Sequence, residues 1–172
     1  NMPDPNLVRL CDEMGFMMMA EPFDAWDVAQ CENGYHRWFN AESDIKGMTW
    51  AERDMLNMLH QWRNNPSVVM WSVGNEVPTQ RTEGGYKVVY FLQDICHRED
   101  PTRICTSGIN FTTAAMSNGF ADALDIAGLN YHTHKGYFNM KDTTHSNVVI
   151  GSETASTVSS RGVYSLDTSL KF

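Results

Sequence analysis

The sequence has no uninterrupted apolar run that approaches the ~18–20 residues a membrane span needs. It has no block of lysine or arginine either, and 13 basic residues against 21 acidic ones give a formal net charge of −8. This acidic balance argues against a phosphate-backbone partner. We therefore expect neither a nucleic acid nor a membrane among the partners of this chain.

Cysteine is also scarce, with 4 residues, and none of them forms a C-x-x-C pair. No histidine pair has zinc-finger spacing, so the common structural zinc sites are not expected. Cys96 and Cys105 lie in apolar surroundings and are interpreted as buried free thiols. No glycine-rich phosphate-binding motif follows an expected strand, which disfavours a nucleotide-binding fold.

Helix-like and strand-like segments alternate along the 172 residues. Apolar residues at helical spacing predict a helix over 5–14, and a T-x-x-E capping box at 49–52 begins a second one that ends before Pro66. Two more helices are expected, over about 85–98 and near 115–124. Short apolar runs between the helices predict strands over 16–20, 68–73, 103–109, 125–129 and 147–150.

These strands are apolar almost throughout instead of alternating, and helices connect them. Both features indicate a parallel sheet in an α/β fold. An open doubly wound sheet and part of an eight-stranded (β/α) barrel fit the pattern equally well. The irregular, aromatic-rich stretch over 21–47 is long for a connection, which suggests a functional loop.

Glutamates follow two of the expected strands, Glu76 after Gly-Asn and Glu153 after Gly-Ser. Because parallel strands end at one face of the sheet, we expect the two carboxylates to face one another across a pocket. Carboxylates about 5–5.5 Å apart suit retaining cleavage of a glycosidic bond. Trp71, Tyr131 and His132 are suitable walls for such a pocket. A solvated loop position is the alternative for either glutamate alone.

The stretch NPSVVMWSVGNE at residues 65–76 resembles the acid/base segment of glycoside hydrolase family 2, which includes β-galactosidases, β-glucuronidases and β-mannosidases. Residues 10–16 and 21–26 are similar to the family's third barrel strand and the approach to it. VIGSE at residues 149–153 is similar to its nucleophile segment. The resemblance implies a partial (β/α)8 TIM barrel holding about strands three to seven of the family's catalytic domain.

The same resemblance implies roles for individual residues. Glu76 would be the general acid/base and Glu153 the nucleophile. Asn75 would hydrogen-bond the sugar 2-hydroxyl, and Tyr131 would hydrogen-bond and aim the nucleophile. His132 would line the pocket.

Asp24 and Trp26 would lie near the sugar-binding rim, although core packing fits Trp26 equally well. Members of the family with an active-site magnesium carry a Glu-x-His pair in this loop, where the present sequence reads DAWD at residues 24–27. We therefore expect no metal and no organic cofactor.

The function implied is hydrolysis of terminal β-linked sugars with retention of configuration. The run SETASTVSSRG at residues 152–162 looks most like bacterial β-galactosidases, so β-galactosides are the leading substrates. Asn139-Met140-Lys141 spells the Asn-x-Lys pair of glucuronidases but precedes the nucleophile, so we interpret it as coincidence. A β-glucuronidase, a β-mannosidase and a non-catalytic carbohydrate-binding barrel remain alternatives.

We further expect residues 1–172 to be a fragment of a single barrel domain, without the family's flanking β-sandwich domains. Its partner is expected to be an oligosaccharide or another β-glycoside. The chain is expected to belong to a larger multidomain protein. Whether that protein is a homo-oligomer is left open by the sequence. The compartment cannot be read from the sequence, with a bacterial periplasmic or secreted location favoured slightly.

Overall fold

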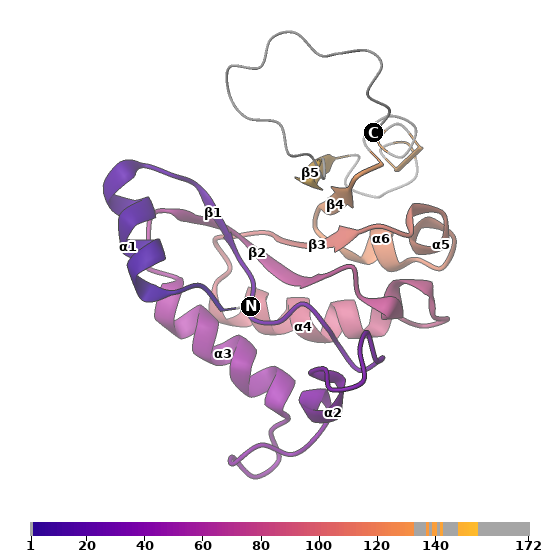
Figure 1. Cartoon of the computed structure of the whole chain (residues 1–172), viewed down its shortest axis with the longest axis horizontal. Coiled ribbons are helices and arrows are strands. Elements are labelled where there is room, and N and C mark those ends of the chain that lie inside the picture. The colour runs from indigo at the N-terminus through magenta and orange to yellow at the C-terminus, as the bar shows by residue number, and fades with distance from the viewer. Residues whose placement is uncertain (1, 133–136, 138, 141, 143–147, 155–172) are drawn as a thin grey trace, which may run out of the picture.

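The computed structural model describes residues 2–132, 137, 139, 140, 142 and 148–154. Within this part of the chain, parallel strands form one five-stranded sheet in the order β1-β2-β3-β4-β5. The strands are Met18–Ala20 (β1), Val68–Asn75 (β2), Cys105–Ile109 (β3), Ala127–Asn130 (β4) and Val149–Glu153 (β5). The order of the strands in space is their order along the chain, which distinguishes this sheet from a doubly wound one, where the order reverses. The sheet curls into a half-barrel (Figure 1), and the expected partial TIM barrel is confirmed.

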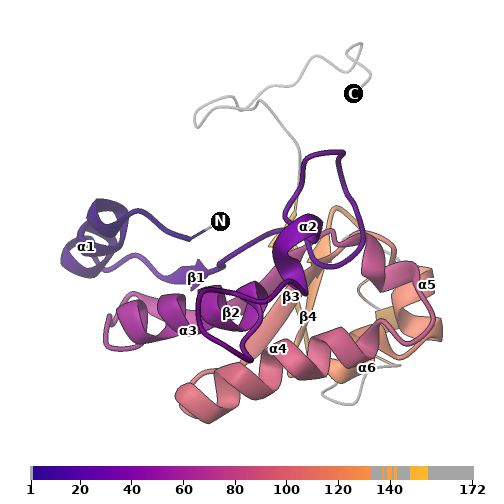
Figure 2. The ribbon, with the colours of Figure 1, turned by 90° about the horizontal axis from the view of Figure 1, so that it is seen from below.

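The helices described are α1 Pro5–Met14, α2 His36–Phe39, α3 Trp50–Trp62, α4 Tyr86–Glu99, α5 Thr112–Ser117 and α6 Phe120–Ala123, with a 3₁₀ turn η1 at Pro78–Arg81. Figure 2 shows α3 and α4 lying along the same side of the sheet. Thr49 caps α3, because its side-chain oxygen accepts the Glu52 N–H at 3.2 Å. The described helices include none with the length and apolarity to span a membrane.

The helix expected near 115–124 is two shorter helices, α5 and α6. Gly119 separates them with a φ of 83°, a left-handed conformation that interrupts a helix. The side chain of Asn118 then accepts the Phe120 N–H at 3.0 Å and starts α6. The glycine therefore ends one helix and begins the next, where apolar periodicity alone suggested continuity.

Trp71 lies in the core and does not form a pocket wall, so that expectation is wrong. Its side chain is completely buried, and its indole N–H donates to Asp100 Oδ2 at 3.0 Å. Asp100 immediately follows α4, so Trp71 points from β2 toward the helical layer. Cys96 of α4 and Cys105 of β3 are buried free thiols, as expected.

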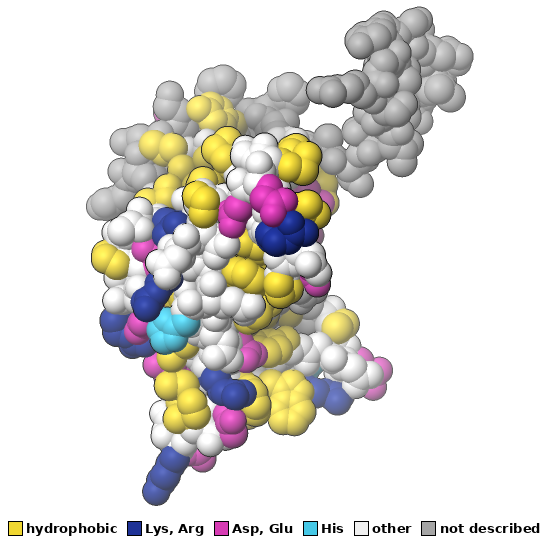
Figure 3. Space-filling view, turned by 90° about the vertical axis from the view of Figure 1, so that its left-hand side faces the viewer, with side chains coloured by type: hydrophobic (Ala, Val, Ile, Leu, Met, Phe, Trp, Pro, Cys, Tyr) yellow, Lys and Arg dark blue, Asp and Glu magenta, His cyan; other side chains and the backbone are white. Residues whose placement is uncertain are grey.

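The edge of the sheet formed by β1, together with the neighbouring helix α1, exposes apolar side chains. Figure 3 looks onto the side of the molecule that carries α1 and β1, where hydrophobic side chains lie among charged ones. The exposed apolar residues of this region include Leu7, Leu10, Met14, Phe16 and Met17. Within the described residues β1 pairs only with β2, so β1 is an edge strand.

Candidate active site

The polar residues that end β2, β4 and β5 meet at a single amide group. The Nδ2 atom of Asn130 lies 3.0 Å from Glu76 Oε1, 3.0 Å from Glu153 Oε2 and 2.9 Å from Asn75 Oδ1. The Oδ1 atom of Asn130 accepts the Ser152 hydroxyl at 2.7 Å, which fixes the orientation of the amide. Because both carboxylate oxygens contact one nitrogen atom, they lie no more than about 6 Å apart. The two glutamates therefore face one another, as the sequence predicted.

Irregularities in β2 and β5 aim the residues of this cluster. In β2, three residues separate Ser72 from Asn75 while their partners in β3 are two apart, so β2 contains one extra residue. In β5 the register shifts in the same way, so that Asn130 pairs with Glu153. Since side chains alternate along a strand, one extra residue moves the next side chain to the other face. Each shift turns the residue after it toward Asn130.

Gly108 of β3 makes room for the two asparagines. A Cβ atom on this residue would lie 2.2 Å from Asn75 Oδ1 and 3.0 Å from Asn130 Oδ1. Neither distance is compatible with ordinary packing, and the first would displace Asn75. The absence of a side chain at Gly108 therefore allows the hydrogen bond between Asn75 and Asn130.

The backbone at two site residues has a positive φ, which is uncommon for residues other than glycine. Glu76 has a φ of 50°, and its N–H donates to Gly108 O at 2.8 Å. Tyr131 has a φ of 64° at the centre of a tight turn closed by the His132 N–H to Asn130 O at 2.8 Å. Such conformations persist where surrounding contacts impose them, and they cluster at functional sites.

Tyr131 is joined to Glu153 twice. Its hydroxyl donates to Glu153 Oε1, and its backbone N–H donates to Glu153 O at 2.6 Å. The hydrogen bond to Glu153, with burial and the negative charges of Glu153 and Glu76, raises the pKa of Tyr131 to about 12. Tyr131 is therefore a protonated donor to the Glu153 carboxylate at neutral pH.

The structure separates the remaining predicted residues. The Asp24 side chain is exposed, and its backbone oxygen accepts the Asn75 N–H at 3.2 Å, so it supports the cluster through the main chain. His132 is exposed directly beside Tyr131. Trp26 is 0% exposed, and its indole N–H donates to Val73 O at 2.7 Å, so it packs in the core and is not at the rim.

Two polar residues of this region, Asn130 and Glu21, were not predicted from the sequence as part of the site. Asn130 carried the same signal as the glutamates, since it directly follows an expected strand, but an amide suggested no chemistry by itself. Glu21 follows β1 and accepts the Ser72 hydroxyl at 2.5 Å. Burial raises the pKa of Glu21, and the hydrogen bond from Ser72 opposes that effect.

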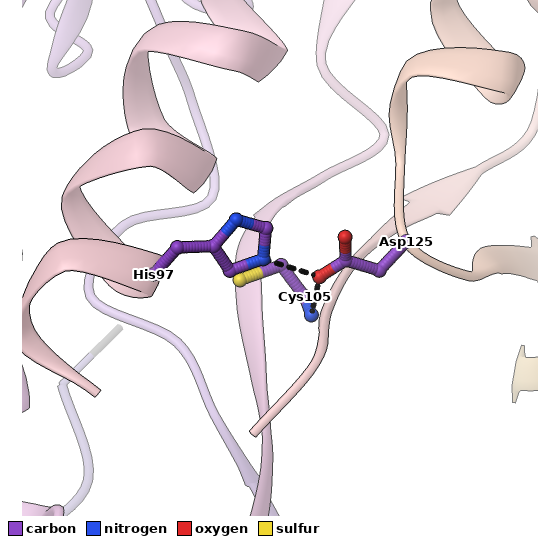
Figure 4. Close-up of side chains that lie close together, drawn as sticks. All are labelled: His97, Cys105 and Asp125. Atoms are coloured by element: carbon purple, nitrogen blue, oxygen red, sulfur yellow. Dashed lines mark hydrogen bonds and ion pairs between the residues drawn. The ribbon is translucent and has the colours of Figure 1, made fainter. Parts of the chain in front are cut away.

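A separate cluster at the other end of the strands has the residue types of a metal site. Figure 4 shows His97 and Cys105 beside Asp125, with the imidazole directed at the carboxylate. Asp125 Oδ2 lies 2.7 Å from His97 Nε2 and accepts the Cys105 N–H at 2.8 Å. A hydrogen bond with Cys96, together with burial, raises the pKa of the Cys105 thiol, which keeps it protonated and a poor ligand. We interpret this cluster as a tie between α4 and the starts of β3 and β4.

A curled parallel sheet with two facing carboxylates at the carboxyl ends of its strands is the arrangement of barrel-type glycoside hydrolases. The sequence profile described as "Glycosyl hydrolases family 2, TIM barrel domain" matches residues 3–167. The chain belongs to glycoside hydrolase family 2.

Known proteins agree with this membership. The β-galactosidase BoGH2A of Bacteroides ovatus is 30% identical, over 100% of this chain and 23% of that protein. A putative β-glucuronidase of Formosa agariphila is 29% identical, over 98% of this chain and 14% of that protein. A crystal structure of a family 2 member from Bacteroides cellulosilyticus superposes with a TM-score of 0.77 at 27% identity, over 90% of this chain and 19% of that one. The chain thus spans less than a quarter of the length of each of these relatives.

Proposed function

We propose that this barrel segment carries the catalytic pair of a retaining β-glycosidase, with Glu153 as the nucleophile and Glu76 as the acid/base. The observation that carries this proposal is the amide of Asn130, which contacts both carboxylates and limits the distance between the two contacting oxygen atoms to about 6 Å. Retaining enzymes hold the pair at about 5–5.5 Å, whereas inverting ones leave about 6.5–9.5 Å for a water molecule. The hydrogen bonds of Tyr131 also suit a carboxylate that must stay ionised and aimed.

In the first step a carboxylate oxygen of Glu153 bonds to the anomeric carbon. The bond from that carbon to the leaving oxygen breaks, and the proton of Glu76 passes to the leaving oxygen. In the second step the Glu76 carboxylate takes a proton from water, the water oxygen bonds to the anomeric carbon, and the ester to Glu153 breaks. Asn75 accepts from Asn130 through Oδ1, which leaves its amide nitrogen to donate to the sugar 2-hydroxyl.

A β-galactoside is the substrate we favour. The relative at 30% identity is named a β-galactosidase. In the described part of the chain, the side-chain partners of Glu76 and Glu153 are the neutral Asn130 and Tyr131, which suits an uncharged sugar. A β-glucuronide is the second candidate, because the relative at 29% identity is named a putative β-glucuronidase.

A mechanism-based label tests both the residues and the sugar. The full-length protein is incubated with dinitrophenyl 2-deoxy-2-fluoro-β-galactoside, and its peptides are weighed by mass spectrometry. We expect a sugar adduct on the peptide that contains Glu153, and no adduct in Glu153→Gln. Glu76→Gln, the matched control, should still form the adduct from this activated substrate, while hydrolysis of unactivated galactosides falls about 10²–10⁴-fold.

Other outcomes would redirect the assignment. An adduct on another residue would refute the role of Glu153. Labelling by the corresponding glucuronide or mannoside, but not by the galactoside, would assign that sugar to the substrate in place of galactose. If the folded protein formed no adduct with any of the three, a non-catalytic carbohydrate-binding barrel would become the better assignment.

A further inference from the structure

The bulge of β2 lies between Ser72 and Asn75, directly before the proposed acid, Glu76. A bulge interrupts the regular pairing of a strand, so its backbone groups need partners outside the regular ladder. The partners that this segment finds therefore help to decide where Glu76 points.

The loop after β1 holds the bulge on one side through the indole of Trp26. The indole N–H donates to Val73 O at 2.7 Å, and both residues are completely buried. Gly74 provides the space, because a Cβ atom on it would lie 2.4 Å from Trp26 Nε1. The indole also packs against Phe39 and Phe120, with ring centroids 6.5 Å and 5.6 Å away. The donor is therefore fixed in place, and the Val73 carbonyl is directed toward it.

Strand β3 holds the same segment on the other side. The buried Ser107 hydroxyl donates to Gly74 O at 2.7 Å, and the Glu76 N–H donates to a backbone oxygen of β3 at 2.8 Å. On the side of β1, Asp24 O accepts the Asn75 N–H at 3.2 Å. The bulged segment is thus tied to both neighbouring elements. Contacts of this kind are what can impose the φ of 50° that Glu76 adopts.

The contact of Trp26 bears on the acid more than on the nucleophile. Without the indole N–H, the buried Val73 carbonyl would lose this partner, and its peptide group should turn toward another donor. Glu76 lies three residues further along the same segment, and a displacement of about 1 Å can slow a reaction about 100-fold. Glu153 belongs to β5, which does not pair with β2 in the described sheet.

We infer that Trp26 and Ser107 are positioning residues for the acid/base, because they hold the bulge of β2 from its two sides and so set the position of Glu76. Both side chains are completely buried, so they act through the main chain and not by contact with the substrate. This inference rests on the proposed function and deepens it.

The test compares two substrates that differ in their need for the acid. Dinitrophenolate leaves a sugar without being protonated, whereas phenolate needs the proton of Glu76. In the full-length protein, Trp26→Phe removes the N–H and keeps an aromatic ring. It should lower kcat/KM about 100-fold for phenyl β-galactoside and about tenfold or less for 2,4-dinitrophenyl β-galactoside. The two corresponding glucuronides replace them if the glucuronide forms the label on Glu153.

Ser107→Ala is the second variant, and it removes a single oxygen atom. It should show the same preference for the dinitrophenyl substrate with smaller losses, and it provides the answer if Trp26→Phe does not fold. Trp71→Phe is the matched control, because Trp71 is also completely buried and donates its indole N–H to Asp100 at 3.0 Å, outside the bulge. Trp71→Phe should lower the melting temperature about as much as Trp26→Phe does, but change kcat/KM less than twofold for either substrate.

The remaining outcomes separate this inference from the proposed function. Equal losses on the two substrates, or no loss, in the folded variants would overturn the inference while active wild-type protein left the proposed function standing. The same selective loss in Trp71→Phe would also overturn it, since any weakening of β2 would then have this effect. If the wild-type protein hydrolysed neither substrate and formed no adduct on Glu153, the inference would fail together with the proposed function.

Discussion

Asn130 places one neutral amide between two carboxyl groups that carry different protonation states in the proposed mechanism. Its amide nitrogen has two N–H bonds and three acceptors within 3.0 Å, from Asn75, Glu76 and Glu153. The donor can therefore shift toward whichever carboxylate bears the larger negative charge. Asn130 is best described as a positioning residue for the pair.

Replacing Asn130 should damage catalysis more than folding. Asn130→Ala removes a donor from both carboxylates, and hydrogen bonds to charged groups contribute about 1.5–3 kcal/mol each, so kcat/KM should fall about 10–100-fold. Ser152→Ala leaves the donor but removes the hydroxyl that orients it, and a smaller loss is expected. Steady-state kinetics on galactosides measures both, and an unchanged rate in Asn130→Ala would contradict the assignment of Asn130.

The ionisation of Tyr131 reports its bond to Glu153. Its pKa of about 12 is above the ordinary value of 10, so Tyr131 stays neutral where exposed tyrosines ionise. Because the folded pKa is raised, the associated stabilisation is complete below pH 10 and is lost as the pH rises through about 12. In Glu153→Gln the charge is gone, and absorbance titration at ~295 nm should show one more tyrosine ionising by about pH 11. An identical titration in the variant would show that Glu153 does not control Tyr131, and Tyr131→Phe identifies the signal.

At the scale of the elements, the sequence predicted the five strands and most of the helices, but not the short helix α2, the break between α5 and α6 or the way the strand ends are aimed. Thr49 and Pro66 predict the start and the end of α3 by known local chemistry, and both predictions are confirmed. The register shifts in β2 and β5 depend on neighbouring strands, so counting alternation from Ser72 would have directed Asn75 away from the site. Gly74 and Gly151 were the available signals, since a glycine inside a strand often marks a bulge.

The buried tryptophans illustrate the same limit. Trp26 and Trp71 occur in segments next to site residues, which made them reasonable pocket walls. Each instead donates its indole N–H to a buried acceptor, Val73 O or Asp100 Oδ2. Burial of a large aromatic depends on contacts across the fold, and a local pattern does not contain them.

Gly108 provides the test at this scale. In Gly108→Ala the new methyl group would overlap Asn75 Oδ1, so kcat should fall about tenfold or more while most of the stability is kept. Gly119→Ala is the contrasting control: its φ of 83° strains any other residue, so stability should fall by about 1 kcal/mol with kcat unchanged. Thermal unfolding and kinetics on both variants separate the effects. If Gly108→Ala, like Gly119→Ala, lost stability but kept its kcat, then Gly108 would be needed only for the conformation of the backbone and not for the position of Asn75.

At the scale of the whole molecule, the candidate active site and the contacts that we expect to stabilise the fold lie at opposite ends of the strands. The carboxyl ends carry Asn130 and the two glutamates. The amino ends carry contacts between the strands and the connections that follow the helices, among them the hydrogen bond from Trp71 of β2 to Asp100 at 3.0 Å. In parallel barrels the first end is where active sites form, and the second contributes to stability.

Asp100 should therefore affect unfolding and not turnover. It accepts from Trp71, Thr102 and Arg103 and is 4% exposed, so Asp100→Ala leaves polar groups unpaired and should cost about 3 kcal/mol of unfolding free energy at pH 7. Burial acts to raise the pKa of Asp100, but its hydrogen bonds outweigh it and lower the pKa below 3.8. With a lowered folded pKa, this stabilisation is complete above pH 3.8 and disappears as the pH falls through the folded value, so wild type and variant should converge in acid.

Urea unfolding followed by tryptophan fluorescence, at pH 7 and near pH 3, measures this difference. Asp94→Ala is the matched control, because Asp94 is exposed on α4 and its loss should change stability by less than about 0.5 kcal/mol. At a temperature where the Asp100→Ala protein remains folded, kcat on galactosides should equal that of the wild type. A large loss of kcat in the folded variant would show that the two ends of the barrel are coupled, and the separation of chemistry from stability would then be wrong.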